Sequence, residues 1–312
     1  MRFTSIFDKR VKTLHRGLEI YGIITSIGML IVLLQGVLVT ATDSGDGCGS
    51  TWPLCFGEVM PQSPALETII EYSHRLVSGL VGLLVIILAI WSWKKLSHIR
   101  ETKFWAIMAV LFIIFQGLMG AGAVVWGNSN IVLALHFGIS AISFATVVIL
   151  TVLAFEDGKE PITPKVSKGF RYYLFFVLVY CYAVIYTGAY VKHTGSSYAC
   201  PDFPLCHGQV LPDLSVPGGF QISVQLLHRF SGILLLIFLI ILFIWAFKQL
   251  SHVKLLTVLT GVSVLLVLIQ AGSGVAIVYI QDNITTSLIH ASVISLLFTV
   301  LCYIGMIITR RR

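Results

Sequence analysis

Four histidines recur in this sequence at a spacing that suggests two equivalent metal sites. His74 and His136 are 62 residues apart, and His228 and His290 are also 62 residues apart. An offset of 154 residues maps the first pair onto the second. Neutral imidazole is the commonest protein ligand for metals. The repeated pair therefore predicts a repeated site that binds a metal ion or a metal-containing cofactor.

The residues next to the histidines distinguish the two pairs. Arg75 and Arg229 directly follow the first histidine of each pair. Glu71 lies three residues before the first histidine of the first pair, and Gln225 takes the equivalent position in the second. Residues three apart share one face of a helix. Only the first pair therefore has a carboxylate beside it, unless Glu71 is an interfacial side chain that turns toward water.

Four of the six cysteines lie in two long loops, at about residues 41–68 and 192–221. Four thiols allow three pairings, and the short separations favour Cys48 with Cys55 and Cys200 with Cys206. Disulfides would place both loops on an oxidising face of the molecule. The other two cysteines lie within apolar segments and are expected to be core residues.

Membrane-spanning helices must position these residues. The 312 residues are 57% hydrophobic and 11% charged, with a mean hydropathy of +0.92, whereas roughly 25% of residues are charged in soluble domains. Apolar stretches of about 20 residues, the length that crosses a bilayer, begin near Ile20, Ile69, Phe104, Ile131, Tyr172, Ile222, Leu255 and Thr286. We predict an all-α integral membrane protein with eight transmembrane helices, the first of which is too long for a signal peptide.

Basic residues indicate the topology of the chain in the membrane. Of the 21 lysines and arginines, 18 lie in the two terminal tails and in every second loop. Because positive charge remains on the cytoplasmic side, both termini are expected in the cytoplasm. This distribution accounts for the net charge of +7 without a nucleic-acid partner.

The sequence also contains an internal repeat. The offset of 154 relates Gln116 to Gln270 and Gly120 to Gly274, and an offset of 151 relates Trp-Pro-Leu-Cys at 52–55 to Phe-Pro-Leu-Cys at 203–206. We expect two four-helix bundles repeated in parallel, related by an axis along the membrane normal. The expected parts are a cytoplasmic N-terminal tail (1–19), a first half (20–155), a cytoplasmic linker (156–171) and a second half (172–312).

This topology places the four histidines close to the extracytoplasmic face. Each lies about one or two turns into a helix that enters from outside, within roughly 10 Å of the outer interface. Ionisable residues in membrane helices are usually functional. Simple hydrogen bonding to a neighbouring helix would suit one such histidine better than four, and structural zinc prefers four closely spaced ligands.

Haem suits two axial histidines on different helices of a four-helix bundle. We expect Gly79, Gly138, Gly232 and Gly274 to make room for it. Guanidinium groups bind carboxylates with defined geometry, so Arg75 and Arg229 are expected to bind haem propionates, with snorkelling to lipid headgroups as the alternative. Because carboxylates in apolar surroundings cluster at reaction centres, the first half is expected to bind the haem that reacts. The second half would then bind a haem that passes electrons.

From about Ile20 to the last helix, the chain resembles the haem A synthase family of the bacterial kind. The motifs are Gly-Asp-Gly-Cys-Gly at 45–49, Trp-Pro-Leu-Cys at 52–55, Glu-Tyr-Ser-His-Arg at 71–75, Leu-His-Phe-Gly at 135–138, Leu-His-Arg at 227–229 and Ile-His at 289–290. The resemblance implies the conversion of haem O to haem A, in which a ring methyl group is oxidised to a formyl group with oxygen from water.

The resemblance also implies a role for each site residue. His74 and His136 would flank the substrate haem O, and Glu71 would act at the reacting methyl group. His228 and His290 would ligate a resident haem b, the cofactor, which carries electrons away.

Further expectations concern the loops and the surroundings. In the family the first-loop cysteines are linked to activity and the second-loop pair to structure, so Cys48 and Cys55 are functional candidates, either redox-active or ordering the loop. We expect a multi-pass protein of a bacterial cell membrane, with a haem O-producing enzyme as a plausible partner. The sequence identifies neither the electron acceptor nor the oligomeric state.

Three other functions fit part of the pattern. A di-haem electron-transfer cytochrome would use the histidine pairs but not the difference between Glu71 and Gln225. A haem exporter or chaperone would bind haem and release it unchanged. A thiol oxidase that couples loop cysteines to quinone would need no histidines.

Overall fold

The computed structural model describes residues 2–127 and 129–310, with side chains from Arg16 onward. These ranges contain eight α-helices, which are α1 (Arg2–Ala41), α2 (Leu66–Lys95), α3 (Thr102–Trp126), α4 (Asn130–Glu156), α5 (Lys168–His193), α6 (Gly219–Gln249), α7 (Lys254–Tyr279) and α8 (Ile284–Thr309). Each is long and apolar enough to cross a membrane, with the span of α1 running from Arg16 to Ala41. The predicted all-α membrane fold is confirmed.

The helices begin earlier than the apolar stretches do. Helices α2 to α8 start one to four residues before the positions predicted from hydropathy, and α1 extends back to Arg2. Polar residues at the helix starts account for part of this difference. The side chains of Ser129, Ser167 and Asn283 accept hydrogen bonds from backbone N–H groups in the first turns of α4, α5 and α8, as N-capping residues do.

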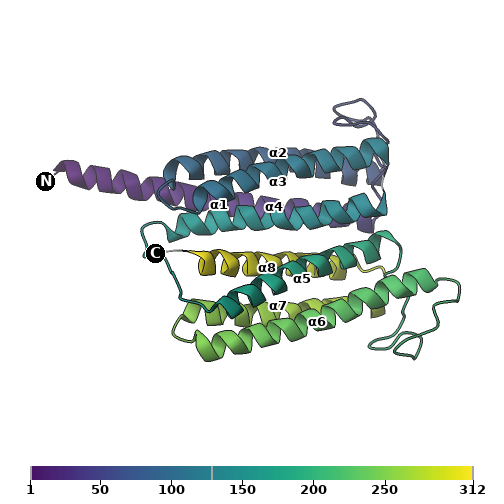
Figure 1. Ribbon diagram of the computed structural model, residues 1–312. Coiled ribbons are helices and arrows are strands. Elements are labelled where there is room, and N and C mark those ends of the chain that lie inside the picture. The colour runs from purple at the N-terminus through teal and green to yellow at the C-terminus, as the bar shows by residue number, and fades with distance from the viewer. Residues whose placement is uncertain (1, 128, 311–312) are drawn as a thin grey trace.

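The helices form two sets of four (Figure 1). In the first set α1 contacts α2 and α4, while α3 contacts α2 and α4, and the corresponding pairs of α5 to α8 are also in contact. Each set is therefore a ring of four helices, in which α2 faces α4 and α6 faces α8 across the interior. The predicted domain bounds and the duplication about an axis along the membrane normal stay predictions.

Helices α4 and α8 form the centre of the molecule. Within the most apolar 18-residue stretch of each of these two helices, 72% is buried inside the protein, compared with 11% in α3. Helix α8 packs against α1, α4 and α5, so it belongs to the second ring and also joins the two sets. Small side chains such as Ala141, Ala145 and Ser295 are buried along these two helices and allow the close approach that membrane helices need.

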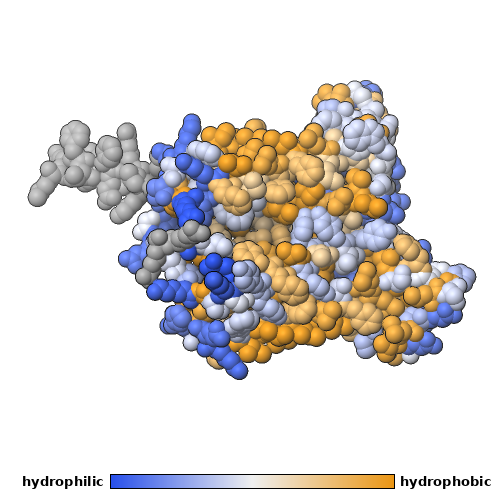
Figure 2. Space-filling model, viewed as in Figure 1, coloured by the Kyte–Doolittle hydropathy of each residue, from blue (hydrophilic) through white to orange (hydrophobic). Residues whose placement is uncertain are grey.

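The two ends of the bundle differ. The start of α1, the end of α8 and the 157–167 link between the sets lie at one end, and the cysteine-bearing loops at 42–65 and 194–218 lie at the other, which we call the disulfide end (Figure 1). Apolar residues cover the middle of the visible surface, while hydrophilic residues gather at the end where the chain begins and finishes (Figure 2). The face of the membrane on which each end lies stays a prediction.

Candidate functional site

The second histidine pair lies inside the α5–α8 ring. His228 of α6 and His290 of α8 face each other, with 6.4 Å between their ring centres. Two metal–nitrogen bonds of about 2 Å each, plus the distance from each nitrogen to its ring centre, require roughly 6 Å. This pair therefore has the separation at which two imidazoles share one metal ion.

A hydroxyl group lies within hydrogen-bond distance of Nδ1 of each histidine in this pair. Nδ1 of His228 lies 2.9 Å from Oγ1 of Thr187 on α5, and Nδ1 of His290 lies 2.9 Å from Oγ of Ser273 on α7. Such outer hydrogen bonds accompany nearly all metal-binding histidines. With Nδ1 engaged, Nε2 of each ring is left as the ligating nitrogen.

The first histidine pair lies in the equivalent place within the α1–α4 ring, with His74 on α2 and His136 on α4. Nε2 of His136 lies 3.1 Å from the side-chain amide nitrogen of Gln116 on α3. Nδ1 of both histidines is buried and, among the residues that the structure describes, has no hydrogen-bond partner. Buried polar atoms are nearly always satisfied, so the unpaired Nδ1 atoms distinguish the first pair from the second.

A glycine on the preceding helix lies against each of the four histidines. A Cβ atom added to Gly36, Gly120, Gly188 or Gly274 would lie 3.5, 3.3, 2.8 or 3.1 Å from the Cε1 atom of His74, His136, His228 or His290, respectively. The sequence reasoning identified only Gly274 of these four. The repeat offsets could have revealed the others, because they equate Gly36 with Gly188 and Gly120 with Gly274.

The other glycines expected to make room for haem behave differently. Gly138 does not face the histidines, because it packs beneath the ring of Tyr186 on α5, so the prediction for this residue is wrong. Gly79 and Gly232 have open space where a Cβ would be.

Both predicted disulfides are present at the disulfide end. Cys48 bonds to Cys55 with an S–S distance of 2.05 Å, and Cys200 bonds to Cys206 with 2.02 Å. In each loop the second cysteine pairs with the residue three positions on, across two residues of positive φ. Two consecutive residues of positive φ define the tight type I′ hairpin turn, so the two loops share one local fold.

Each arginine that follows a histidine fastens one of these loops to its helix. Nη1 of Arg75 donates to the backbone carbonyl oxygens of Thr51 and Leu54, at 2.6 and 3.1 Å. Nη1 of Arg229 donates to the two equivalent carbonyl oxygens of the second loop, at 2.7 and 2.8 Å. Sequence reasoning missed these loop contacts. Binding of Arg75 and Arg229 to haem propionates stays a prediction.

Glu71 is buried, with 4% of its surface exposed. Its Oε2 accepts a hydrogen bond of 2.8 Å from the backbone N–H of Cys48, and its Oε1 accepts one of 3.0 Å from Nε of Arg75 and a second from Nη2. The alternative that Glu71 turns toward water is therefore wrong. The carboxylate is balanced by one guanidinium and lies one turn before His74.

Gln225 makes the same loop contact without the charge. Its Oε1 accepts a hydrogen bond from the backbone N–H of Cys200, and its Nε2 donates to the carbonyl of Ser197 at 2.8 Å. Arg229, which has no carboxylate in this position, donates from Nη2 to the carbonyl of Cys200 instead. Anchoring the first cysteine is thus common to both halves, and negative charge at this position is particular to Glu71.

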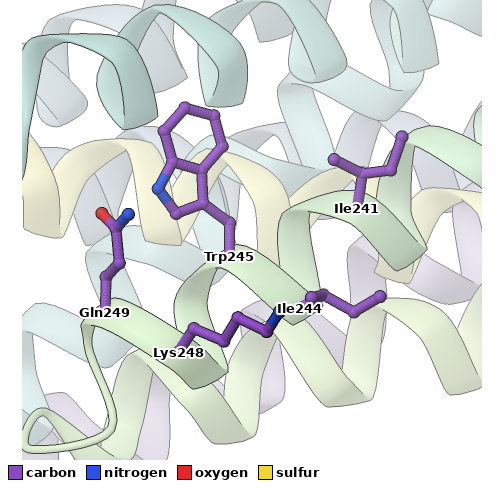
Figure 3. A pocket seen from close by; sticks show the side chains of 5 residues that line it. All are labelled: Ile241, Ile244, Trp245, Lys248 and Gln249. Carbon is purple, nitrogen blue, oxygen red and sulfur yellow. The ribbon is translucent and has the colours of Figure 1, made fainter.

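One groove on the surface lies away from the histidine pairs. A groove at the far end of α6 from the disulfide loops is lined by Ile241, Ile244, Trp245, Lys248 and Gln249, with Lys248 lying along the helix beside Ile244 (Figure 3). It contains none of the paired histidines. Among the side chains that the structure describes, from Arg16 to Gly127 and from residue 129 to Arg310, no three His, Cys, Asp or Glu gather as a zinc site would require.

Comparisons with known proteins agree with these motifs. The profile of the cytochrome oxidase assembly protein family matches residues 19–302. The chain is 60% identical to heme A synthase of Halalkalibacterium halodurans over 300 residues, which cover 96% of this chain and 99% of that protein. It is 60% identical to heme A synthase of Alkalihalophilus pseudofirmus over 298 residues, covering 95% and 99% of the two chains, and 47% identical to heme A synthase of Bacillus licheniformis over 301 residues, covering 96% and 98%. The chain belongs to the haem A synthase family.

Proposed function

We propose that this protein synthesises haem A from haem O by oxidising a ring methyl group to a formyl group. The names of the relatives support synthesis of haem A. The observation that carries the finer proposal is the buried Glu71–Arg75 pair, which accompanies only one of two otherwise similar histidine pairs. That asymmetry supports a reaction at the first pair and electron transfer at the second.

In this proposal each histidine pair holds one haem. His74 and His136 bind the substrate, haem O, between α2 and α4, and His228 and His290 bind haem b between α6 and α8. Bound haem supplies the iron through which electrons leave. Conversion of a methyl group and one water into a formyl group releases four electrons and four protons, so the site needs both an electron exit and a proton acceptor.

Glu71 is suited to accept a proton. Each carboxylate oxygen has two acceptor positions, and the contacts to Cys48 and Arg75 leave part of this capacity free. Arg75 holds the carboxylate in place through hydrogen bonds from Nε and Nη2 to Oε1. The negative charge stabilises electron loss from the substrate, and the free oxygen positions take a proton from the water that supplies oxygen.

The same proposal places the protein in a bacterial cell membrane with both termini in the cytoplasm. The disulfide end then lies on the extracytoplasmic face, where disulfides persist. The histidines, about two helical turns from that end, lie near the outer leaflet. A lipid-soluble substrate made by a neighbouring haem O-producing enzyme would reach the first pair from the bilayer.

Glu71→Gln tests the reaction without disturbing the loop. Native Gln225 shows that a glutamine side chain accepts the cysteine N–H in this local fold, so the variant should keep its disulfide and its haem binding. The experiment is pyridine haemochrome and mass analysis of haem extracted from the purified protein, expressed with a source of haem O. Wild type should yield haem A, and the variant should retain haem O or a partly oxidised product.

The matched control is Gln225→Glu, which alters the equivalent position in the second half. It should leave the identity of the product unchanged. Equal amounts of haem A from wild type and Glu71→Gln would remove Glu71 from the reaction. Haem recovered unchanged from wild type would instead favour an electron-transfer cytochrome or a haem carrier.

A further inference from the structure

The two histidine pairs differ in what holds the outer face of each imidazole ring. In the second pair, Thr187 and Ser273 bind Nδ1 of the two histidines. The repeat offsets of 152 and 154 place Gln35 and Met119 at the equivalent positions of the first pair. Neither supplies a hydroxyl group, and within the described chain Nδ1 of His74 and of His136 is unpaired.

The hydroxyl groups also determine which nitrogen carries the proton. Thr187 donates its own hydroxyl proton to the carbonyl oxygen of Val184 at 2.8 Å, and Ser273 donates its proton to the carbonyl oxygen of Gln270 at 2.9 Å. Since each hydroxyl has one proton, its oxygen must accept from the histidine. In this arrangement Nδ1 carries the hydrogen, and the lone pair of Nε2 is available to a metal.

The first pair is arranged differently at its ligating nitrogen. The amide group of Gln116 lies 3.1 Å from Nε2 of His136 and also donates to Ser140. A bound iron would have to displace this amide from Nε2. Among the described residues, the first pair thus lacks hydrogen bonds at Nδ1, and Gln116 of α3 contacts Nε2 of His136 instead.

We infer that Thr187 and Ser273 are positioning residues that make the second pair a site of retention, whereas the first pair is a site of exchange. Outer hydrogen bonds orient a ligating histidine and raise its basicity, and their loss typically costs about 10- to 100-fold in metal affinity. A resident haem b must stay through many turnovers, whereas a substrate haem must enter and its product must leave. This inference rests on the proposed function and adds how the fold separates a cofactor from a substrate of nearly the same shape.

The test measures haem release, which requires no turnover. Two parent chains isolate the sites, one with His74 and His136 replaced by alanine and the other with His228 and His290 replaced by alanine. Each purified, haem-loaded protein is mixed with excess apomyoglobin, and the transfer of haem is followed by absorbance. We expect slower release from the chain that keeps the second pair.

Substitutions within that chain then assign the effect to the hydroxyl groups. Thr187→Val and Ser273→Ala should release haem about tenfold faster or more, and the electron paramagnetic resonance signal of the ferric haem should shift with the altered imidazoles. Thr187→Ser, which restores the hydroxyl, should release haem at the parent rate. Ser292→Ala is the control, because Ser292 lies on α8, as His290 does, but its hydroxyl donates to the carbonyl oxygen of Leu288 in its own helix.

Parent release rates in both Thr187→Val and Ser273→Ala would overturn the inference, as would equal release from the two parent chains. Neither result depends on whether haem A is formed. Conversely, fast release from Thr187→Val in a protein that makes no haem A would support the inference and contradict the proposed function. The two proposals therefore fail independently.

Discussion

Tyr186 of α5 lies directly over the backbone of Gly138 of α4, so that a Cβ atom at Gly138 would be 2.5 Å from Cε1 of the tyrosine ring. The hydroxyl of Tyr186 bonds to that of Tyr182 at 2.7 Å, and Tyr182 stacks on Phe298 of α8 with 5.3 Å between ring centres. These four residues form a joint between the two helix sets. The joint has no room for an additional methyl group.

Gly138→Ala should therefore destabilise the protein by forcing Tyr186 out of place. Adding a methyl group to a tightly packed interior costs about 1–3 kcal/mol. We expect a lower thermal unfolding temperature in detergent, measured by circular dichroism. Gly79→Ala is the matched control, because no atom lies within 4 Å of its added Cβ. A Gly138→Ala protein as stable as the Gly79→Ala protein would contradict this packing.

Glu71→Ala should destabilise the first loop more than Glu71→Gln does. Alanine leaves the buried N–H of Cys48 without its acceptor, and an unsatisfied buried polar group costs about 1–3 kcal/mol. The measurement is the rate at which a phosphine reductant opens the Cys48–Cys55 disulfide, which should rise in the alanine variant only. Gln225→Ala should have the corresponding effect on Cys200–Cys206. Equal rates for the alanine and glutamine variants of Glu71 would show that this hydrogen bond does not hold the loop.

Arg310→Ala should weaken the end of the bundle opposite the disulfides. Arg310 binds Glu156 of α4, which also accepts a hydrogen bond of 2.5 Å from Tyr303 of α8. The Arg310 side chain is 4% exposed but that of Glu156 is 24% exposed, so we expect a loss of about 1–3 kcal/mol, less than for a fully buried pair. Thermal unfolding measures this loss, and Arg310→Lys should retain part of the stability. An unchanged unfolding temperature in Arg310→Ala would exclude a stabilising role.

Protonation of Asp202 should loosen the second loop in acid. The pKa of Asp202 lies below its ordinary value because its carboxylate accepts hydrogen bonds from the backbone N–H groups of Gly208 and His207. A lowered pKa stabilises the folded loop above the unfolded pKa of about 3.9, and this stabilisation is lost as the pH falls through the folded pKa. Thr51, which takes the same position in the first loop and accepts from Phe56, does not titrate in this range.

The measurement is the rate of reduction of each disulfide at falling pH, with the products mapped by mass spectrometry. The ratio of Cys200–Cys206 to Cys48–Cys55 reduction should rise on acidification. In Asp202→Asn, which does not titrate, the ratio should not change with pH. A constant ratio in wild type would show that Asp202 does not control the loop.

Much of the fold was predictable because the bilayer restricts the choices. Eight long apolar runs can only be membrane helices, and the repeat offsets identify which residues have counterparts. The two disulfides followed from short spacing on one face of the membrane. The first turns of α2, α5 and α6 were missed because they contain polar or charged residues such as Glu67 and Lys168, which a hydropathy criterion leaves out.

The residues that distinguish the two sites were less accessible to prediction. Thr187 and Ser273 are common residue types in membrane helices, where a hydroxyl usually bonds to its own backbone, and only the neighbouring ring reveals their second partner. The loop contacts of Arg75 depend on carbonyl directions that arise once the hairpin has formed. Gly138 was misassigned because its proximity to His136 in sequence hides that the two residues, two positions apart, lie on nearly opposite sides of α4.

The central position of α4 and α8 has a consequence for any attempt to divide the molecule. Each carries the second histidine of its pair, and each also packs against helices of the other set. A chain severed in the 157–167 link would expose the faces of α4 and α8 that pack against the other set, so we expect neither fragment to be stable alone. The two helix sets therefore depend on each other, and a residue inserted into α4 would turn His136 by about 100° and misalign the face of α4 that packs against α5 and α8.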